Sequence, residues 1–117
     1  GEFELKHGSN VIGKAGGPAD LQLASGSLSR RHALITVGDR KDDCTVEDLG
    51  STNKSHILDD SGEPQTMNAG SVYPLAAQQN LVFGDVHAAF EFLGVNSNTA
   101  GGESSVDSRS RADIETI

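Results

Sequence analysis

Aromatic residues and cysteine are scarce in this chain. Tryptophan is absent, tyrosine and cysteine occur once each, and phenylalanine occurs four times. A single cysteine forms no internal disulfide, so nothing in the sequence requires an oxidising compartment. With so few aromatics, Val, Ile, Leu and Ala must build most of the core, which favours strands over large aromatic pockets.

Long hydrophobic runs are also missing. No segment approaches the roughly 20 consecutive apolar residues of a membrane-spanning helix. The first residues lack the charged and then apolar pattern of a signal peptide. We therefore expect an intracellular protein that makes no contact with membranes.

Positive charge is in short supply, with 9 Lys and Arg residues against 17 Asp and Glu residues and a net charge of -8. Proteins that bind the nucleic-acid backbone usually present a basic face, so this balance argues against direct nucleic-acid binding. A single phosphate group needs only a local positive site. The densest positive charge, Arg30 and Arg31, lies in the polar segment 25–32.

Metal-ligand spacings are not found either. His7, His56 and His87 are far apart along the chain. The acidic pairs at 42–43 and 59–60 lack the alternating oxygen ligands of a calcium loop. We therefore expect no metal and no cofactor.

What the sequence does contain is short apolar segments with a period of two, separated by turn-forming residues. The predicted strands are residues 3–5, 21–23, 32–37, 44–48, 57–58, 72–73, 81–83 and 87–93. No window of 11 residues carries a helical stripe. This pattern predicts an all-β fold, a sandwich of two sheets, in one domain over residues 1–93.

From residue 94 onward the composition changes to Asn, Ser, Gly, Asp and Arg. Apolar periodicity almost disappears in this segment. A stretch of this kind buries too little apolar surface to offset the entropy of ordering it. Residues 94–117 are therefore predicted to be a disordered tail.

Three short segments carry the polar groups that suit a binding site. They are IGK at 12–14, SRRH at 29–32 and DLGSTN at 48–53. Alternate loops of a sandwich gather at one end, so three such loops can converge on one ligand. Their cations, hydroxyl groups and amide suit a tetrahedral anion, because phosphate oxygens accept strong hydrogen bonds and the cations offset the charge.

These segments, in this order and followed by LVFG at 81–84, resemble the signatures of the forkhead-associated (FHA) domain family. The match runs from about residue 3 to residue 93. The resemblance implies a two-sheet β-sandwich of about 11 strands that binds phosphothreonine peptides through its apical loops. It also implies a phospho-dependent adaptor in the nucleus, with a role in DNA-damage signalling.

The resemblance assigns a role to each motif residue. The positions that would contact the phosphate are Lys14, Ser29, Arg30 and Thr52. Asn53 would bind the peptide main chain just after the phosphothreonine, and His32 would brace the loop from inside. Gly13 would let the backbone turn without a Cβ clash. Arg31 is expected to lie mainly in solvent.

The chain departs from the family pattern in two places. Lys14 replaces the usual Arg, which keeps the charge but loses the planar, bidentate guanidinium. Lys54 and Ser55 replace the usual Gly-Thr after the Asn. If that Gly is normally left-handed, Lys54 strains the turn by about 1 kcal/mol.

Two other interpretations stay open. An FHA-like module could associate with a protein through a sheet face without phosphate, or form a dimer in which a phosphorylated tail residue, Thr99 or Thr116, occupies the pocket of another copy. A catalytic triad of Ser29, His32 and Asp48 is disfavoured, because a Ser and a His three apart at the start of a strand point to different faces. We therefore expect no enzymatic activity.

Overall fold

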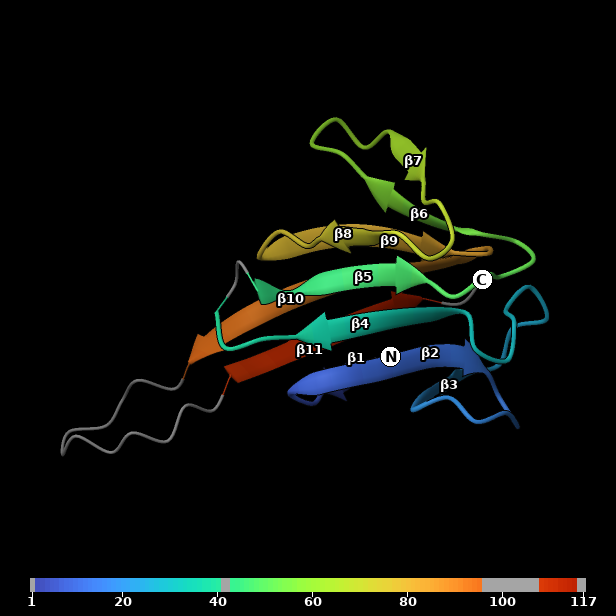
Figure 1. The fold of residues 1–117 in the computed structure, drawn as a ribbon, viewed down its shortest axis with the longest axis horizontal. Helices are drawn as coiled ribbons and strands as arrows, with labels where there is room; N and C mark the ends of the chain where they lie inside the picture. The colour runs from blue at the N-terminus through green and yellow to red at the C-terminus, as the bar shows by residue number, and fades with distance from the viewer. Residues whose placement is uncertain (1, 41–42, 96–107, 116–117) are drawn as a thin grey trace, which may run out of the picture.

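The computed structural model describes residues 2–40, 43–95 and 108–115, which form two packed sheets (Figure 1). The six-stranded sheet contains, in spatial order, β1 (Glu2–Leu5), β11 (Ser108–Glu115), β10 (Val86–Val95), β9 (Gln78–Phe83), β6 (Ser55–Leu58) and β7 (Pro64–Thr66). The five-stranded sheet contains β3 (Leu21–Leu23), β2 (Gly8–Lys14), β4 (Ala33–Val37), β5 (Thr45–Asp48) and β8 (Val72–Pro74). The predicted all-β sandwich is thus confirmed.

Strand pairing is antiparallel except between β2 and β3, which run parallel. The described residues contain no α-helix, and no helix long and apolar enough to cross a membrane.

The core lies between the sheets and follows the period of two read from the sequence. In β4, Ala33, Ile35 and Val37 are all buried, as predicted. The largest fully buried side chains are Phe83 and Phe90 of the opposite sheet. Aliphatic residues supply most of the rest, so the scarcity of aromatics does fit a β-sandwich core.

Strand β2 was not predicted, because Gly8, Ser9, Asn10 and Gly13 interrupt its apolar alternation. Asn10 is 1% exposed, yet its side chain is satisfied: Nδ2 donates to the carbonyl oxygens of Lys6, Gly8 and Ile35, and Oδ1 accepts from the Lys6 N–H. A residue that usually marks a turn is here part of the strand, because its polar groups all find partners.

The predicted disordered tail is wrong for residues 94–95 and 108–115. Strand β10 continues to Val95, and β11 lies between β1 and β10 and pairs with both. Ala112 and Ile114 of β11 are 1% and 2% exposed. The sequence of this segment is mostly polar, but it is ordered by hydrogen bonds along both edges of β11 and by burial of these two side chains. The sandwich therefore extends past residue 93. The tail residues Thr99 and Thr116 lie outside the described residues.

Candidate functional site

Three connections that carry the predicted site residues lie at one end of the sandwich, the loop end, at the right of Figure 1. They are the end of β2 with the segment that follows it, the segment that precedes β4, and the segment that follows β5. The backbone N–H of Lys14 donates to the Ser29 carbonyl at 3.0 Å, and the N–H of Thr52 donates to Ser29 Oγ at 3.1 Å. Ser29 therefore joins all three segments.

Gly13 is required at this end for a reason different from the predicted one. Its φ is not positive, so the turn itself does not demand glycine. A Cβ at this position would overlap the Arg30 carbonyl oxygen and lie 2.7 Å from its carbon. The missing side chain thus allows the Arg30 backbone to pack directly on β2.

His32 lies inside the loop end, 0% exposed, between two backbone groups. Its Nδ1 accepts the Ser29 N–H at 3.1 Å, and its Nε2 donates to the Lys54 carbonyl at 2.8 Å. These partners require the neutral ring with its proton on Nε2. Burial lowers the pKa of His32, against the opposing effects of the Lys54 carbonyl and the Asp48 charge.

Asp48 is a buried carboxylate with a complete set of donors. Oδ1 accepts from the hydroxyls of Ser51 and Ser55 at 2.5 and 2.6 Å, and Oδ2 accepts from the backbone N–H groups of Gly50 and Ser51 at 3.0 and 2.9 Å. Burial acts to raise the pKa of Asp48, but these hydrogen bonds outweigh it and hold the pKa below its ordinary value.

A catalytic triad is not assembled from Ser29, His32 and Asp48. Both ring nitrogens of His32 are engaged by backbone groups, so neither receives a proton from the Ser29 hydroxyl. The distance from His32 Nε2 to Asp48 Oδ1 is 4.0 Å, longer than a hydrogen bond. These side chains stabilise the loops and leave Ser29 without a base.

Lys54 has a φ of 70°, the one positive φ at a non-glycine position in the part of the chain that the structure describes. Its carbonyl oxygen accepts from His32 Nε2 and from the Gly84 N–H, the latter at 3.0 Å. The left-handed turn thus presents one carbonyl to two donors. A non-glycine residue with this φ is expected to cost about 1 kcal/mol, so the left-handed position anticipated for Lys54 is present.

The comparison with known families matches the FHA domain to residues 10–84. The chain belongs to the FHA domain family. The crystal structure of the FHA domain of the CT664 protein from Chlamydia trachomatis is 30% identical, covers 73% of this chain and 78% of that chain, and superimposes with a TM-score of 0.58.

Two further structures share the FHA fold. The FhaA FHA domain, solved in complex with the intracellular domain of Rv3910, is 22% identical, with a TM-score of 0.54, and covers 95% of this chain and 84% of its own. A structure from work on phosphothreonine-dependent FHA domain interactions is 20% identical, with a TM-score of 0.53. The match covers 97% of this chain and 81% of that chain. A search of curated protein sequences gave no significant match.

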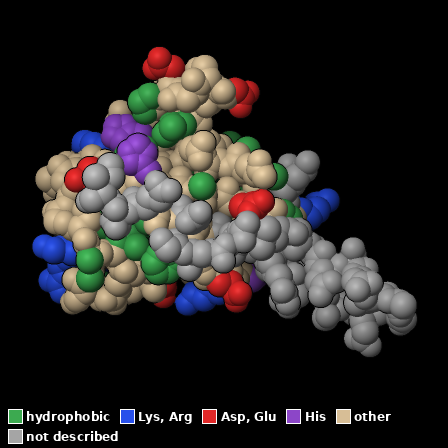
Figure 2. Space-filling view, turned by 180° about the vertical axis from the view of Figure 1, so that it is seen from behind, with side chains coloured by type: hydrophobic (Ala, Val, Ile, Leu, Met, Phe, Trp, Pro, Cys, Tyr) green, Lys and Arg blue, Asp and Glu red, His purple; other side chains and the backbone are tan. Residues whose placement is uncertain are grey.

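Positive side chains of this FHA domain are exposed at the loop end. They are Lys14, Arg30, Arg31 and Lys54. In the space-filling view from behind, Lys and Arg side chains are visible at the left edge, which is the loop end turned round (Figure 2). None of the four forms an ion pair with another described residue, although the chain is acidic overall. Uncompensated positive charge of this kind suits an anion.

Asn53 and Thr52 are exposed beside Ser29. The side-chain amide of Asn53 donates to the Ser27 carbonyl at 2.7 Å. The structure therefore brings Lys14, Ser29, Thr52 and Asn53 to one end, with the Arg30 backbone against Gly13. Arg30 and Arg31 are both exposed.

Sequence reasoning missed a second set of contacts, around Asp85 in the β9–β10 turn. Asp85 Oδ1 accepts from Ser27 Oγ at 2.5 Å and from Ser25 Oγ at 3.1 Å, and the Asp85 N–H donates to Ser27 Oγ at 3.1 Å. Gly84 fits here because a Cβ would lie 2.6 Å from Ser27 Oγ. The sequence pattern predicts only turn-forming residues between the strands at 81–83 and 87–93, since no local pattern reports a contact 58 residues away.

Proposed function

We propose that this FHA domain binds phosphothreonine peptides at its loop end and acts as a non-catalytic, phospho-dependent protein-interaction module. The observation that carries the proposal is the convergence on Ser29 of hydrogen bonds from Lys14 and Thr52, at an end whose cations have no acidic partner among the described residues. The phosphothreonine-dependent interactions studied for a related FHA domain support it.

The hydrogen bonding of the Ser29 hydroxyl supports this proposal. Its oxygen already accepts the Thr52 N–H, so its own proton is left to donate outward. A phosphate dianion has three terminal oxygens, each a strong acceptor. Ser29 would donate to one of them, while Lys14 and Arg30 supply charge-assisted hydrogen bonds to the others.

Asn53 would hold the peptide main chain. Its Nδ2 donates to the Ser27 carbonyl, which fixes the orientation of the amide and leaves Oδ1 as an acceptor for a peptide N–H. A nuclear location and a role in DNA-damage signalling remain predictions of the family resemblance.

The test is a titration of the 117-residue chain with three matched peptides that carry Thr, phosphothreonine or phosphoserine. We expect no measurable binding of the Thr peptide, and phosphothreonine to bind about fourfold more tightly than phosphoserine, because one buried methyl group is worth about 0.8 kcal/mol. Equal binding of all three peptides, or no binding across a broad phosphopeptide library, would contradict the proposal.

A second candidate is phospho-independent association, favoured by the two departures at Lys14 and Lys54. The double variant with Ser29→Ala and Arg30→Ala separates the two functions. Partner binding that survives both substitutions would support the second candidate, and loss of binding supports phosphate recognition.

A further inference from the structure

Asp85 is held rigidly although it is exposed. Its backbone N–H and one carboxylate oxygen both bond to Ser27 Oγ, and the same oxygen accepts from Ser25. The hydroxyls of Ser27 and Ser25 lower the pKa of Asp85. Gly84, directly before it, is packed against Ser27. The carboxylate therefore has a fixed position, unlike an ordinary surface acid.

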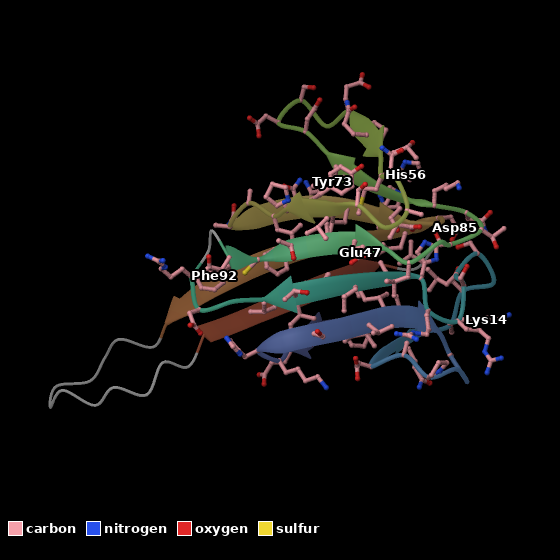
Figure 3. All side chains as sticks on the ribbon, in the orientation of Figure 1. Lys14, Glu47, His56, Tyr73, Asp85 and Phe92 are labelled. Carbon is pink, nitrogen blue, oxygen red and sulfur yellow. The ribbon has the colours of Figure 1, made fainter. Side chains whose placement is uncertain are left out.

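That position is next to the residue proposed to hold the peptide. Ser27 receives the side-chain amide of Asn53 on its carbonyl and bonds Asp85 through its hydroxyl. Ser27 therefore contacts both Asn53 and Asp85. Lys14 bonds through its backbone to Ser29, which Thr52, the residue before Asn53, also contacts. Figure 3 shows Asp85 and Lys14 at the same end of the sandwich.

Ser27 and Ser25 both donate to Oδ1 of Asp85, and no described side chain donates to its second carboxylate oxygen. No described Lys, Arg or His lies within ion-pair distance of it, and His87 attracts it only from farther away. The loop end therefore carries exposed positive charge and, at Asp85, a hydrogen-bonded negative charge that contacts the same residue, Ser27, as Asn53. A ligand with both signs of charge fits this arrangement.

We propose that Asp85 is a specificity-determining residue, which selects peptides that carry Lys or Arg within the three residues after the phosphothreonine. This inference rests on the proposed function, since the peptide must first be placed by the phosphate and Asn53. An acidic peptide residue at the same place meets the Asp85 charge and is disfavoured.

The test uses phosphothreonine peptides with Lys, Ala or Glu at each of the three positions after the phosphothreonine, and the same set at the three positions before it. Each is titrated against the wild-type chain, Asp85→Asn and Asp60→Asn. The Asn side chain at 85 keeps an oxygen for Ser27 and Ser25 but removes the charge. Asp60 is an exposed acid in the β6–β7 turn and serves as the matched control.

We expect the best Lys peptide to bind the wild-type chain about fivefold more tightly than its Ala counterpart, near the upper end for an exposed ion pair. Asp85→Asn should reduce this ratio to about one, and Asp60→Asn should retain it. Because each ratio is taken within one variant, a general weakening of Asp85→Asn does not affect it.

Two results would overturn the inference while leaving the proposed function intact. One is phosphothreonine-dependent binding by the wild-type chain with no preference for Lys over Ala and Glu. The other is a Lys preference that Asp85→Asn retains in full, which would mean that Asp85 only fixes Ser27. Failure of the folded chain to bind any phosphothreonine peptide would instead overturn the proposed function, and this inference with it.

Discussion

The loop end contains two layers of polar side chains that differ in burial and in their bonding partners. The inner layer consists of His32, Asp48, Ser51 and Ser55. The outer layer consists of Lys14, Ser29, Arg30, Thr52 and Asn53. Inner-layer groups are buried and bonded within the protein, whereas the outer layer keeps exposed cations without acidic partners among the described residues. We infer that the inner layer supplies stability and the outer layer supplies affinity.

The largest expected effect comes from breaking the inner layer at Asp48. Asp48→Ala leaves two hydroxyls and two backbone N–H groups without their acceptor. We expect the free energy of unfolding to fall by at least about 3 kcal/mol in urea denaturation. For Asp48→Asn, which keeps one acceptor oxygen, the free energy of unfolding should fall by less. A loss below about 1 kcal/mol for the Ala variant would show that this network does not stabilise the loops.

Substitutions in the outer layer should weaken peptide binding and leave the free energy of unfolding almost unchanged. Ser29→Ala and Arg30→Ala should each weaken phosphothreonine-peptide binding by about 1.5 to 3 kcal/mol, the range for hydrogen bonds to charged groups. Their unfolding free energies should change by about 1 kcal/mol or less. Arg31→Ala is the matched control, because Arg31 is also exposed but has no assigned phosphate contact. Equal losses for Arg30 and Arg31 would contradict the division between them.

Acid should weaken the inner layer. The pKa of His32 is lowered, so below about pH 6.5 the unfolded chain binds a proton that the folded chain does not. Stability from this group is therefore lost as pH falls from about 6.5 toward the lowered pKa, by up to about 1.4 kcal/mol per pH unit. The lowered pKa of Asp48 adds a further loss when pH falls below about 4.

Nuclear magnetic resonance of the His32 ring checks this pH dependence directly. The ring should keep its neutral form, with the proton on Nε2, to a pH below 6.5. Protonation of His32 at or above its ordinary pKa in the folded chain would be inconsistent with the burial and backbone contacts described for it.

The smallest effect is expected at Lys54, where the two layers meet. Lys54→Gly should raise the free energy of unfolding by about 1 kcal/mol, because glycine adopts a positive φ without a Cβ penalty. Lys54→Ala keeps the strain and should give no gain. A Gly variant no more stable than the Ala variant would show that the left-handed turn stores no strain.

Sequence patterns correctly predicted the features that depend on residues close together in the chain. The alternation of Ala33, Ile35 and Val37 identified β4 and its buried face. The motif around Ser29 and Asn53 identified two loops that the structure brings together. In each case neighbouring residues in the sequence carry the information.

The features that sequence reasoning missed depend on distant partners. Strand β11 is ordered by pairing with β1, about a hundred residues away, and by burial of Ala112 and Ile114. Asn10 belongs to a strand because Ile35 and its own loop satisfy its amide. The contact between Ser27 and Asp85 joins two turns that look ordinary in isolation.

The most direct test of the central claim is a backbone amide titration of the labelled chain by nuclear magnetic resonance, with a phosphothreonine peptide and its unphosphorylated twin. The phosphorylated peptide should shift the amides of residues 13–15, 29–31 and 52–54, and the unphosphorylated twin should shift none of them. Shifts confined to the outer faces of the sheets, or the same shifts with both peptides, would contradict a phosphate site at the loop end.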